Sequence, residues 1–269
     1  VPAVHAERLR VAEATGARAV QLIQENLLPS SIINELSLSN AFRVMLAVGG
    51  STNALIHMTA VAGRLGIKVD LQQLDDMSRH TPVLVDLKPS GENYMEDLFK
   101  AGGLAPILNE LNDFLHLDCM TVTGQSIGDH IRAFASWPQN IVKTIGEPLK
   151  SEGGIAVLRG NLAPDTAIIK QSAATPALLQ HEGRAVVFEN LEDLANRIDD
   201  PDLDVNKDDV LVLRNAGPKG APGMPESGYI PIPKKLAQTG VKDMVRISDA
   251  RMSGTAFGTI VLHICPESY

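Results

Sequence analysis

The stretch from Asn215 to Glu226 combines residue types that could hold a metal ion close to a ligand. It follows an apolar strand predicted at residues 210–214, and residues 217–225 contain three glycines and three prolines. Glycine and proline at this density fix an irregular path that lets the main chain approach a ligand. The stretch ends in the Glu226 carboxylate, a hard oxygen ligand suited to Mg²⁺. The same composition is also typical of a rigid surface loop with a solvated glutamate.

A second stretch, residues 248–256, offers a serine as a candidate base. It follows a strand predicted at residues 243–247 and places Ser253 before a glycine, where the hydroxyl could stand at an exposed tight turn. A serine abstracts a proton only if a metal ion or a positive dipole lowers its high pKa. No histidine lies within several residues of Ser253, so the sequence does not support a Ser-His-acid hydrolase. The alternative is a surface turn in which Asp249 and Arg251 form an exposed pair.

Two shorter motifs carry polar groups that could hold a carboxylate or a polyol. They are the turn-like segments Lys88-Pro89-Ser90-Gly91 and Thr121-Val122-Thr123-Gly124. The seven histidines and two cysteines of the chain show no zinc-ligand spacing. Neither a G-x-G-x-x-G fingerprint nor a Walker sequence occurs, so nucleotide binding has no support.

Composition limits the classes of protein to which the chain can belong. Its 269 residues are 44% hydrophobic and 21% charged, and no apolar run approaches the ~20 residues of a membrane-spanning helix. The net charge is −8, and no Lys/Arg cluster is interleaved with aromatic residues, which argues against a nucleic-acid partner. The only cysteines, Cys119 and Cys265, lie far apart, as expected in a reducing compartment, so a cytoplasmic location is predicted.

The spacing of apolar residues predicts a change of architecture near residue 140. Before it, helices are predicted at residues 5–26, 39–48, 54–65, 71–79, 93–101 and 106–115, with short strands at 67–69 and 82–87. After it, strands are predicted at 155–159, 167–169, 185–189, 210–214, 243–247 and 259–264, with one helix at 191–198. We therefore expect an α/β protein, with an α/β domain over residues 1–140 and a barrel or compact sandwich over 141–269.

Seven motifs in a fixed order resemble the dihydroxy-acid and phosphogluconate dehydratase family over nearly the whole chain. They are Gly49-Gly50-Ser51-Thr52-Asn53-Ala54, Leu87-Lys88-Pro89-Ser90-Gly91, Ala101-Gly102-Gly103-Leu104, Thr121-Val122-Thr123-Gly124, Arg159-Gly160-Asn161-Leu162-Ala163-Pro164-Asp165, Gly223-Met224-Pro225-Glu226 and Ser248-Asp249-Ala250-Arg251-Met252-Ser253-Gly254-Thr255. The amino-acid sequences of two stretches, residues 230–235 and 246–252, resemble the sugar-acid (aldonate) branch of that family.

This resemblance implies an α/β domain followed by a β-barrel domain related to the swivelling domain of aconitase. It also implies a [2Fe-2S] cluster held by three cysteines, and a Mg²⁺ held by carboxylates and a modified lysine. The family places the cysteines, the lysine and most Mg²⁺ ligands in a segment that precedes the matching region. The chain is therefore interpreted as a partial one that lacks this segment and its C-terminal end. Neither Cys119 nor Cys265 falls in a cluster motif of the family.

Two functional roles carry over onto matched positions. Glu226 is implied as the Mg²⁺ ligand from the barrel domain, and Ser253 as the base that removes the C2 proton. The implied activity is dehydration of an aldonate to a 2-keto-3-deoxy acid, in which the cluster acts as a Lewis acid on the C3 hydroxyl and Mg²⁺ stabilises the enolate. The family also implies a homo-oligomer, as a dimer or tetramer. On turn chemistry and motif position, pocket lining is expected from Ser51, Thr52, Lys88, Ser90, Thr121 and Thr123.

Two other functions stay open at this point. One is the dihydroxy-acid dehydratase reaction of branched-chain amino-acid synthesis, on a substrate other than a sugar acid. The other is a non-catalytic fragment that at most binds sugar acids or self-associates. Because the cluster cysteines are expected outside the chain, the isolated chain is predicted to be inactive.

Overall fold

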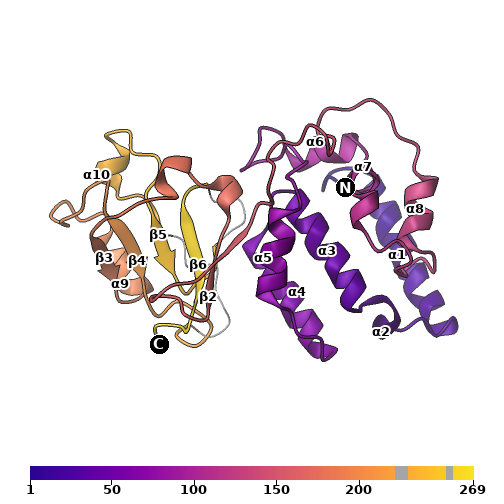
Figure 1. The fold of residues 1–269 in the computed structure, drawn as a ribbon, viewed down its shortest axis with the longest axis horizontal. Coiled ribbons are helices and arrows are strands. Elements are labelled where there is room, and N and C mark those ends of the chain that lie inside the picture. The colour runs from indigo at the N-terminus through magenta and orange to yellow at the C-terminus, as the bar shows by residue number, and fades with distance from the viewer. Residues whose placement is uncertain (222–229, 253–256) are drawn as a thin grey trace. The chain divides into compact units, whose positions relative to one another are not determined.

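The computed structural model describes residues 1–221, 230–252 and 257–269 (Figure 1). Contacts along the chain divide it into two compact units. The helical unit is Val1–Gly49 with Leu55–Gly153, and the sheet unit is Gly50–Ala54 with Gly154–Tyr269. Helices together with a mixed sheet confirm the predicted α/β class. The domain boundary predicted near residue 140 stays a prediction about the full-length protein.

The first half of the chain forms helices at each position where apolar spacing predicts one. Helix α3 begins at a reciprocal cap, in which Asn34 Oδ1 accepts from Ser37 N at 3.0 Å and Ser37 Oγ accepts from Asn34 N at 2.9 Å. A similar cap at Ser126 begins α8, which apolar spacing did not predict. The helices are α1 (Glu7–Gln24), α2 (Pro29–Ile32), α3 (Glu35–Ala47), α4 (Thr52–Arg64), α5 (Leu71–Arg79), α6 (Met95–Lys100), α7 (Ala105–Glu110) and α8 (Ile127–Ala133).

Two strands predicted in this half are wrong. Residues 67–69 form no strand because Ile67 belongs to the end of α4: its N–H donates to Ala62 O at 3.0 Å, after Gly66 turns with a φ of 73°. Residues 82–87 form isolated bridges in place of a ladder. Their apolar run reflects burial in the core, which periodicity alone does not distinguish from a strand.

A six-stranded mixed sheet, in the order β1-β2-β6-β5-β4-β3, forms the centre of the sheet unit. β3, β4, β5 and β6 run parallel, whereas β2 pairs antiparallel with β1 and with β6. In the described pairing β1 and β3 are the edges of the sheet, so this pairing does not close the barrel that the family resemblance implies. All six strands overlap the segments predicted for them, although β5 begins three residues later than predicted: β1 (Ala156–Leu158), β2 (Thr166–Ile169), β3 (Ala185–Phe188), β4 (Val210–Leu213), β5 (Arg246–Ser248) and β6 (Ile260–Cys265).

Alternating side chains of the parallel strands build the core of the sheet unit. Phe188 of β3 and Leu211 of β4 are fully buried and belong to the same apolar cluster as Leu194 of α9 (Leu191–Arg197). The short helix α10 (Lys234–Ala237) adds Leu236 to this cluster, and apolar spacing did not predict it. Within the described ranges, no helix is long and apolar enough to span a membrane.

Candidate active site

The segments predicted to carry the chemistry leave one edge of the sheet. Leu213, at the end of β4, pairs with Ser248, at the end of the parallel strand β5. Carboxyl ends of adjacent parallel strands meet at one edge of a sheet, and α/β proteins bind ligands beyond such edges. Glu226 and Ser253 themselves lie outside the described residues. The candidate site is therefore built from the described residues that follow β3, β4, β5 and β6.

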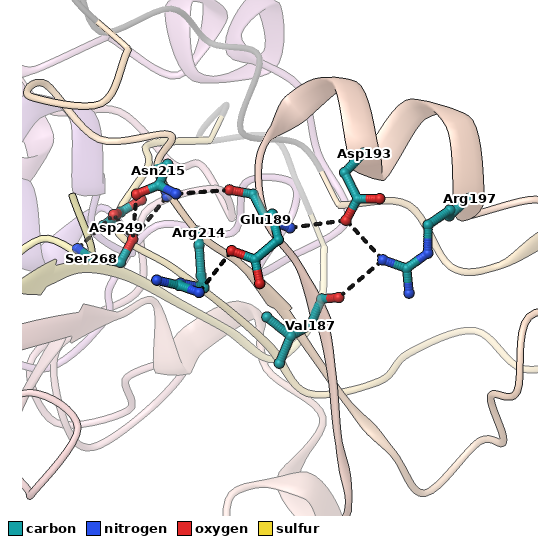
Figure 2. Close-up of polar contacts among 8 residues, drawn as sticks. All are labelled: Val187, Glu189, Asp193, Arg197, Arg214, Asn215, Asp249 and Ser268. Atoms are coloured by element: carbon teal, nitrogen blue, oxygen red, sulfur yellow. Dashed lines mark hydrogen bonds and ion pairs between the residues drawn. The ribbon is translucent and has the colours of Figure 1, made fainter.

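Asp249 joins three segments at this edge (Figure 2). It is 4% exposed, and its Oδ1 accepts from Ala216 N at 3.1 Å. Its Oδ2 accepts from Ser268 N at 3.0 Å and from Ser268 Oγ at 2.7 Å. One carboxylate thus fixes the chain beyond β4, β5 and β6. The alternative of an exposed pair with Arg251 is wrong, because the Asp249 carboxylate is buried and bonds to other donors.

Asn215 extends this network to β3 (Figure 2). Its N–H donates to Ser268 Oγ at 2.8 Å, and its Nδ2 donates to Glu189 O at 2.9 Å. Its φ is 54°, in the left-handed region that asparagine tolerates better than most residues. Beside it, Arg214 and Glu189 form an ion pair with an N–O distance of 2.7 Å. Hydrogen bonds therefore connect the end of β3 to the segment after β6.

At Gly217, in the described part of the glycine-rich stretch, the main chain passes close to two other residues. A Cβ at this position would lie 2.8 Å from Glu267 Oε2 and 2.9 Å from Asp249 O, so only glycine fits. Two residues later, Lys219 N donates to Glu267 Oε2 at 2.7 Å. In the described part of the stretch, the backbone therefore approaches a carboxylate of the protein itself, that of Glu267.

His263 is a buried polar residue of β6 that the sequence analysis missed. It has a φ of 55°, next to a shift in the β2–β6 register, and is 9% exposed. Burial, together with the charge of Arg251, lowers the pKa of the imidazole to about 4. Its Nε2 has no hydrogen-bond partner among the residues that the structure describes. A polar residue inside the apolar run of residues 260–264 is the signal that could have found it.

Thr121 and Thr123, two predicted pocket residues of the helical unit, lie together with a histidine. Thr123 Oγ1 is 2.8 Å from Thr121 Oγ1 and 2.8 Å from His130 Nε2, and Thr121 Oγ1 is 3.2 Å from the same nitrogen. His130 belongs to α8, which explains why turn chemistry did not identify it. This cluster is a set of hydroxyl and imidazole groups suited to hydrogen bonds with a polyol.

The other four predicted pocket residues differ in their contacts and burial. Lys88 Nζ donates to Tyr94 Oη at 2.6 Å, and this bond raises the pKa of the ammonium group. Ser90 is partly buried. In the sheet unit, Ser51 Oγ accepts from Ala54 N at 3.2 Å and caps α4, whereas Thr52 is buried at 4% exposure. Their role as pocket lining stays a prediction.

The thiols of the chain do not fit the cluster that the family resemblance implies. Cys119 lies in the helical unit and Cys265 in the sheet unit. Burial raises the pKa of both thiols, whereas iron binds the thiolate. Across the described ranges, no three His, Cys, Asp or Glu side chains come together as a metal-binding group. Glu226, the implied Mg²⁺ ligand, lies outside those ranges.

An α/β chain with polar segments at the ends of adjacent parallel strands has the architecture of a small-molecule enzyme. Two family models match it: the N-terminal model of dihydroxy-acid/6-phosphogluconate dehydratase over residues 1–130, and the C-terminal model over residues 140–269. The chain belongs to the dihydroxy-acid/6-phosphogluconate dehydratase family.

Relatives in this family carry names from both of its branches. The whole chain is 47% identical to an L-arabinonate dehydratase of Rhizobium leguminosarum bv. trifolii and 45% identical to a 6-deoxy-6-sulfo-D-gluconate dehydratase of Pseudomonas putida, and it covers 47% of each protein. It is 40% identical to a dihydroxy-acid dehydratase of Caldicellulosiruptor saccharolyticus, of which it covers 48%. The chain thus spans about half the length of these relatives.

Proposed function

We propose that the full-length protein is a hydro-lyase that dehydrates a sugar acid to a 2-keto-3-deoxy acid. One structural observation carries the proposal: the segments that contain Glu226 and Ser253 leave adjacent strands at one edge, and Asp249 joins their first residues. Family membership supports dehydration as the reaction class. Greater identity to relatives named for sugar acids than to the dihydroxy-acid dehydratase supports the substrate class.

In the proposed reaction, Ser253 removes the proton from C2 of the aldonate. The hydroxyl on C3 leaves with a proton as water, which gives an enol between C2 and C3. This enol takes up a proton at C3 and becomes the 2-keto acid. Each substrate loses one water and no electrons, so the reaction needs neither an oxidant nor a reductant.

Ser253 requires help because a serine hydroxyl is a weak base at neutral pH. Mg²⁺ bound by the Glu226 carboxylate would stabilise negative charge at the carboxylate end of the substrate and lower the pKa of a nearby hydroxyl. The buried Asp249 network joins only the described residues where the two segments begin, through the bond of Asp249 to Ala216 N. The [2Fe-2S] cluster stays a prediction for the full-length protein, and no step is assigned to it because Cys119 and Cys265 do not fit as its ligands.

Ser253→Ala in the full-length enzyme tests the proposed base. We expect the variant to fold, to keep its metal content and to lose dehydration of aldonates by at least about a hundredfold, the scale of general-base catalysis. Product formation is measured as the 2-keto acid, and folding by thermal unfolding. Substantial remaining turnover in a folded variant would remove Ser253 from this role.

A substrate panel separates the two branches of the family. Pentonates and hexonates are compared with 2,3-dihydroxyisovalerate, and kcat/KM is measured for each. The proposal requires the highest kcat/KM for a sugar acid. A preference for the branched dihydroxy acid would instead assign the protein to branched-chain amino-acid synthesis.

Three further properties are proposed. The isolated chain is inactive, and the full-length protein is a homo-oligomer with a cytoplasmic location. The chain of 269 residues alone is proposed to be inactive, because the family resemblance implies cluster ligands outside it and Cys119 and Cys265 fall in no cluster motif. Iron and sulfide analysis of the purified chain tests this, and a stoichiometric cluster would contradict it. The mass of the full-length protein in solution tests the proposed dimer or tetramer.

A further inference from the structure

A buried ion pair lies at the start of β5, at the opposite end of the strand from Asp249. Arg246 Nη2 is 2.9 Å from Asp243 Oδ1, and the two side chains are 3% and 5% exposed. Exposed pairs of this kind contribute little to stability, whereas a buried charge that loses its partner is strongly destabilising. The pair is therefore a fixed point of the sheet unit.

Asp243 is surrounded by hydrogen-bond donors. Its Oδ2 accepts from Thr175 Oγ1 at 2.6 Å and from Thr259 Oγ1 at 2.9 Å, and Thr259 N also donates to the carboxylate. Burial opposes ionisation, but these donors and the charge of Arg246 outweigh it, and the pKa of Asp243 lies below its ordinary value. The ionised carboxylate holds the guanidinium in one orientation.

The Arg246 guanidinium bonds to the main chain of two different segments. Nη1 donates to Ile230 O and Nη2 donates to Phe257 O, each at 3.1 Å. Ile230 and Phe257 are the first described residues after 222–229 and 253–256. Glu226 and Ser253 each precede one of these carbonyls by four residues. One side chain thus fixes the chain at the same sequence distance beyond both proposed functional residues.

The space for this guanidinium depends on Gly258. Its φ is 124°, which side chains other than glycine rarely adopt, and a Cβ there would overlap both Arg246 Nη2 and Asp243 Oδ1. Arginine is also specific to the task, because its planar fork donates in several directions at once, whereas a lysine ammonium is a point charge.

We propose that Arg246 is a positioning residue of the dehydratase site: it fixes the carbonyls of Ile230 and Phe257, which follow Glu226 and Ser253 by four residues each, and so supports the functions proposed for both. The inference rests on the proposed function of those two residues. Asp249 fixes the chain where the two segments begin, and Arg246 fixes it where they return to the sheet. Mg²⁺ binding by Glu226 and proton removal by Ser253 are therefore both expected to depend on Arg246 through its bonds to the main chain.

Arg246→Lys in the full-length enzyme tests this role. Lysine keeps a charge beside Asp243 but does not span both carbonyls. We expect kcat to fall at least about tenfold with a much smaller change in KM, and the Mg²⁺ concentration for half-maximal activity to rise about fivefold or more, since small misplacements of reacting groups cost large factors in rate. Hydrogen exchange is expected to accelerate in the peptides that contain Ile230 and Phe257.

Leu194→Ala is the matched control. Leu194 is 5% exposed on α9, which packs against the edge strand β3, two strands away from β5. Its truncation destabilises the core without removing a bond of Arg246. At a temperature where the control is folded, kcat and the Mg²⁺ requirement are expected to stay within about twofold of wild type. A loss of kcat equal to that of Arg246→Lys would reduce the role of Arg246 to stability alone.

Two further outcomes decide the proposal. A folded Arg246→Lys enzyme with wild-type kcat, Mg²⁺ requirement and hydrogen exchange overturns it. If Arg246→Lys does not fold, Thr175→Val, which removes one donor to Asp243, is expected to give the same pattern at a smaller size, and unchanged values overturn the proposal. Absence of aldonate dehydration by the wild-type enzyme refutes the proposed function instead, and exchange at Ile230 and Phe257 still decides whether Arg246 fixes both segments.

Discussion

The sheet unit and the helical unit hold their candidate residues in different ways. In the sheet unit, Asp249 and Arg246 are buried and bond to residues that are distant in the sequence. In the helical unit, Thr123 and Lys88 are exposed, and His130 and Tyr94, which contact them, lie within seven residues of them. Buried long-range bonds fix geometry and are costly to break, whereas exposed local contacts adapt at little cost. Substitutions of the candidate residues are therefore expected to cost more stability in the sheet unit than in the helical unit.

The largest effect on stability is expected from Asp249→Ala, which removes the buried carboxylate that joins three segments of the sheet unit. The substitution leaves the N–H groups of Ala216 and Ser268 without their acceptor, and unsatisfied buried donors cost about 1–3 kcal/mol each. We expect the free energy of unfolding to fall by more than about 3 kcal/mol. Urea unfolding of the full-length protein measures it.

Ser268→Ala is the control for that prediction. It removes the hydroxyl that bonds to Asp249 but keeps the Ser268 backbone bond, so a loss of about 1 kcal/mol is expected. Equal losses for the two variants would show that the Asp249 carboxylate does not join the three segments.

His263 gives a pH-dependent effect of intermediate size. Its pKa is about 4 in the folded protein against 6.5 for an ordinary histidine, so the unfolded chain binds the proton first. The contribution to stability is complete above pH 6.5 and is lost as the pH falls toward 4, by about 3 kcal/mol in all. His263→Phe should flatten this part of the stability profile, measured by urea unfolding between pH 7 and pH 4. An unchanged slope would assign the acid sensitivity to other groups.

The smallest effect is expected from Thr123→Val in the helical unit. Its hydroxyl makes exposed, local bonds, so the free energy of unfolding should change by less than about 0.5 kcal/mol. As pocket lining, Thr123 should affect KM for the sugar acid by about threefold or more while kcat stays near wild type. Steady-state kinetics on the full-length enzyme measures both constants. An unchanged KM would show that Thr123 does not line the pocket.

Short apolar runs bounded by glycine or proline were sufficient to predict the six strands of the sheet unit. The same signal failed at residues 67–69, where Ile67 closes a helix end, and at 82–87, where an apolar run is buried without a ladder. Helices α2, α8 and α10 escaped prediction: α2 and α10 span only four residues, too short for a helical period to stand out, and α8 buries only Gly128 and Ile131.

For the candidate site, the residue types in the two polar segments pointed to metal binding and proton removal, but not to what holds these segments. For Asp249 the sequence offered an exposed pair with Arg251 as one alternative, and it cited Arg246 only within the stretch that resembles the sugar-acid branch. Both assignments depend on burial, and burial depends on which strands become neighbours.

The amino-acid sequence by itself determined the family, the α/β class and the segments that contain Glu226 and Ser253, because motifs and apolar spacing are local properties of the chain. Only the tertiary structure decided that Asp249 bonds to Ser268 and that Arg246 bonds to both Ile230 and Phe257. These partners are 11 to 19 residues away. Contacts at such separations exist only after the parallel strands have paired, since strand order brings the segment ends together.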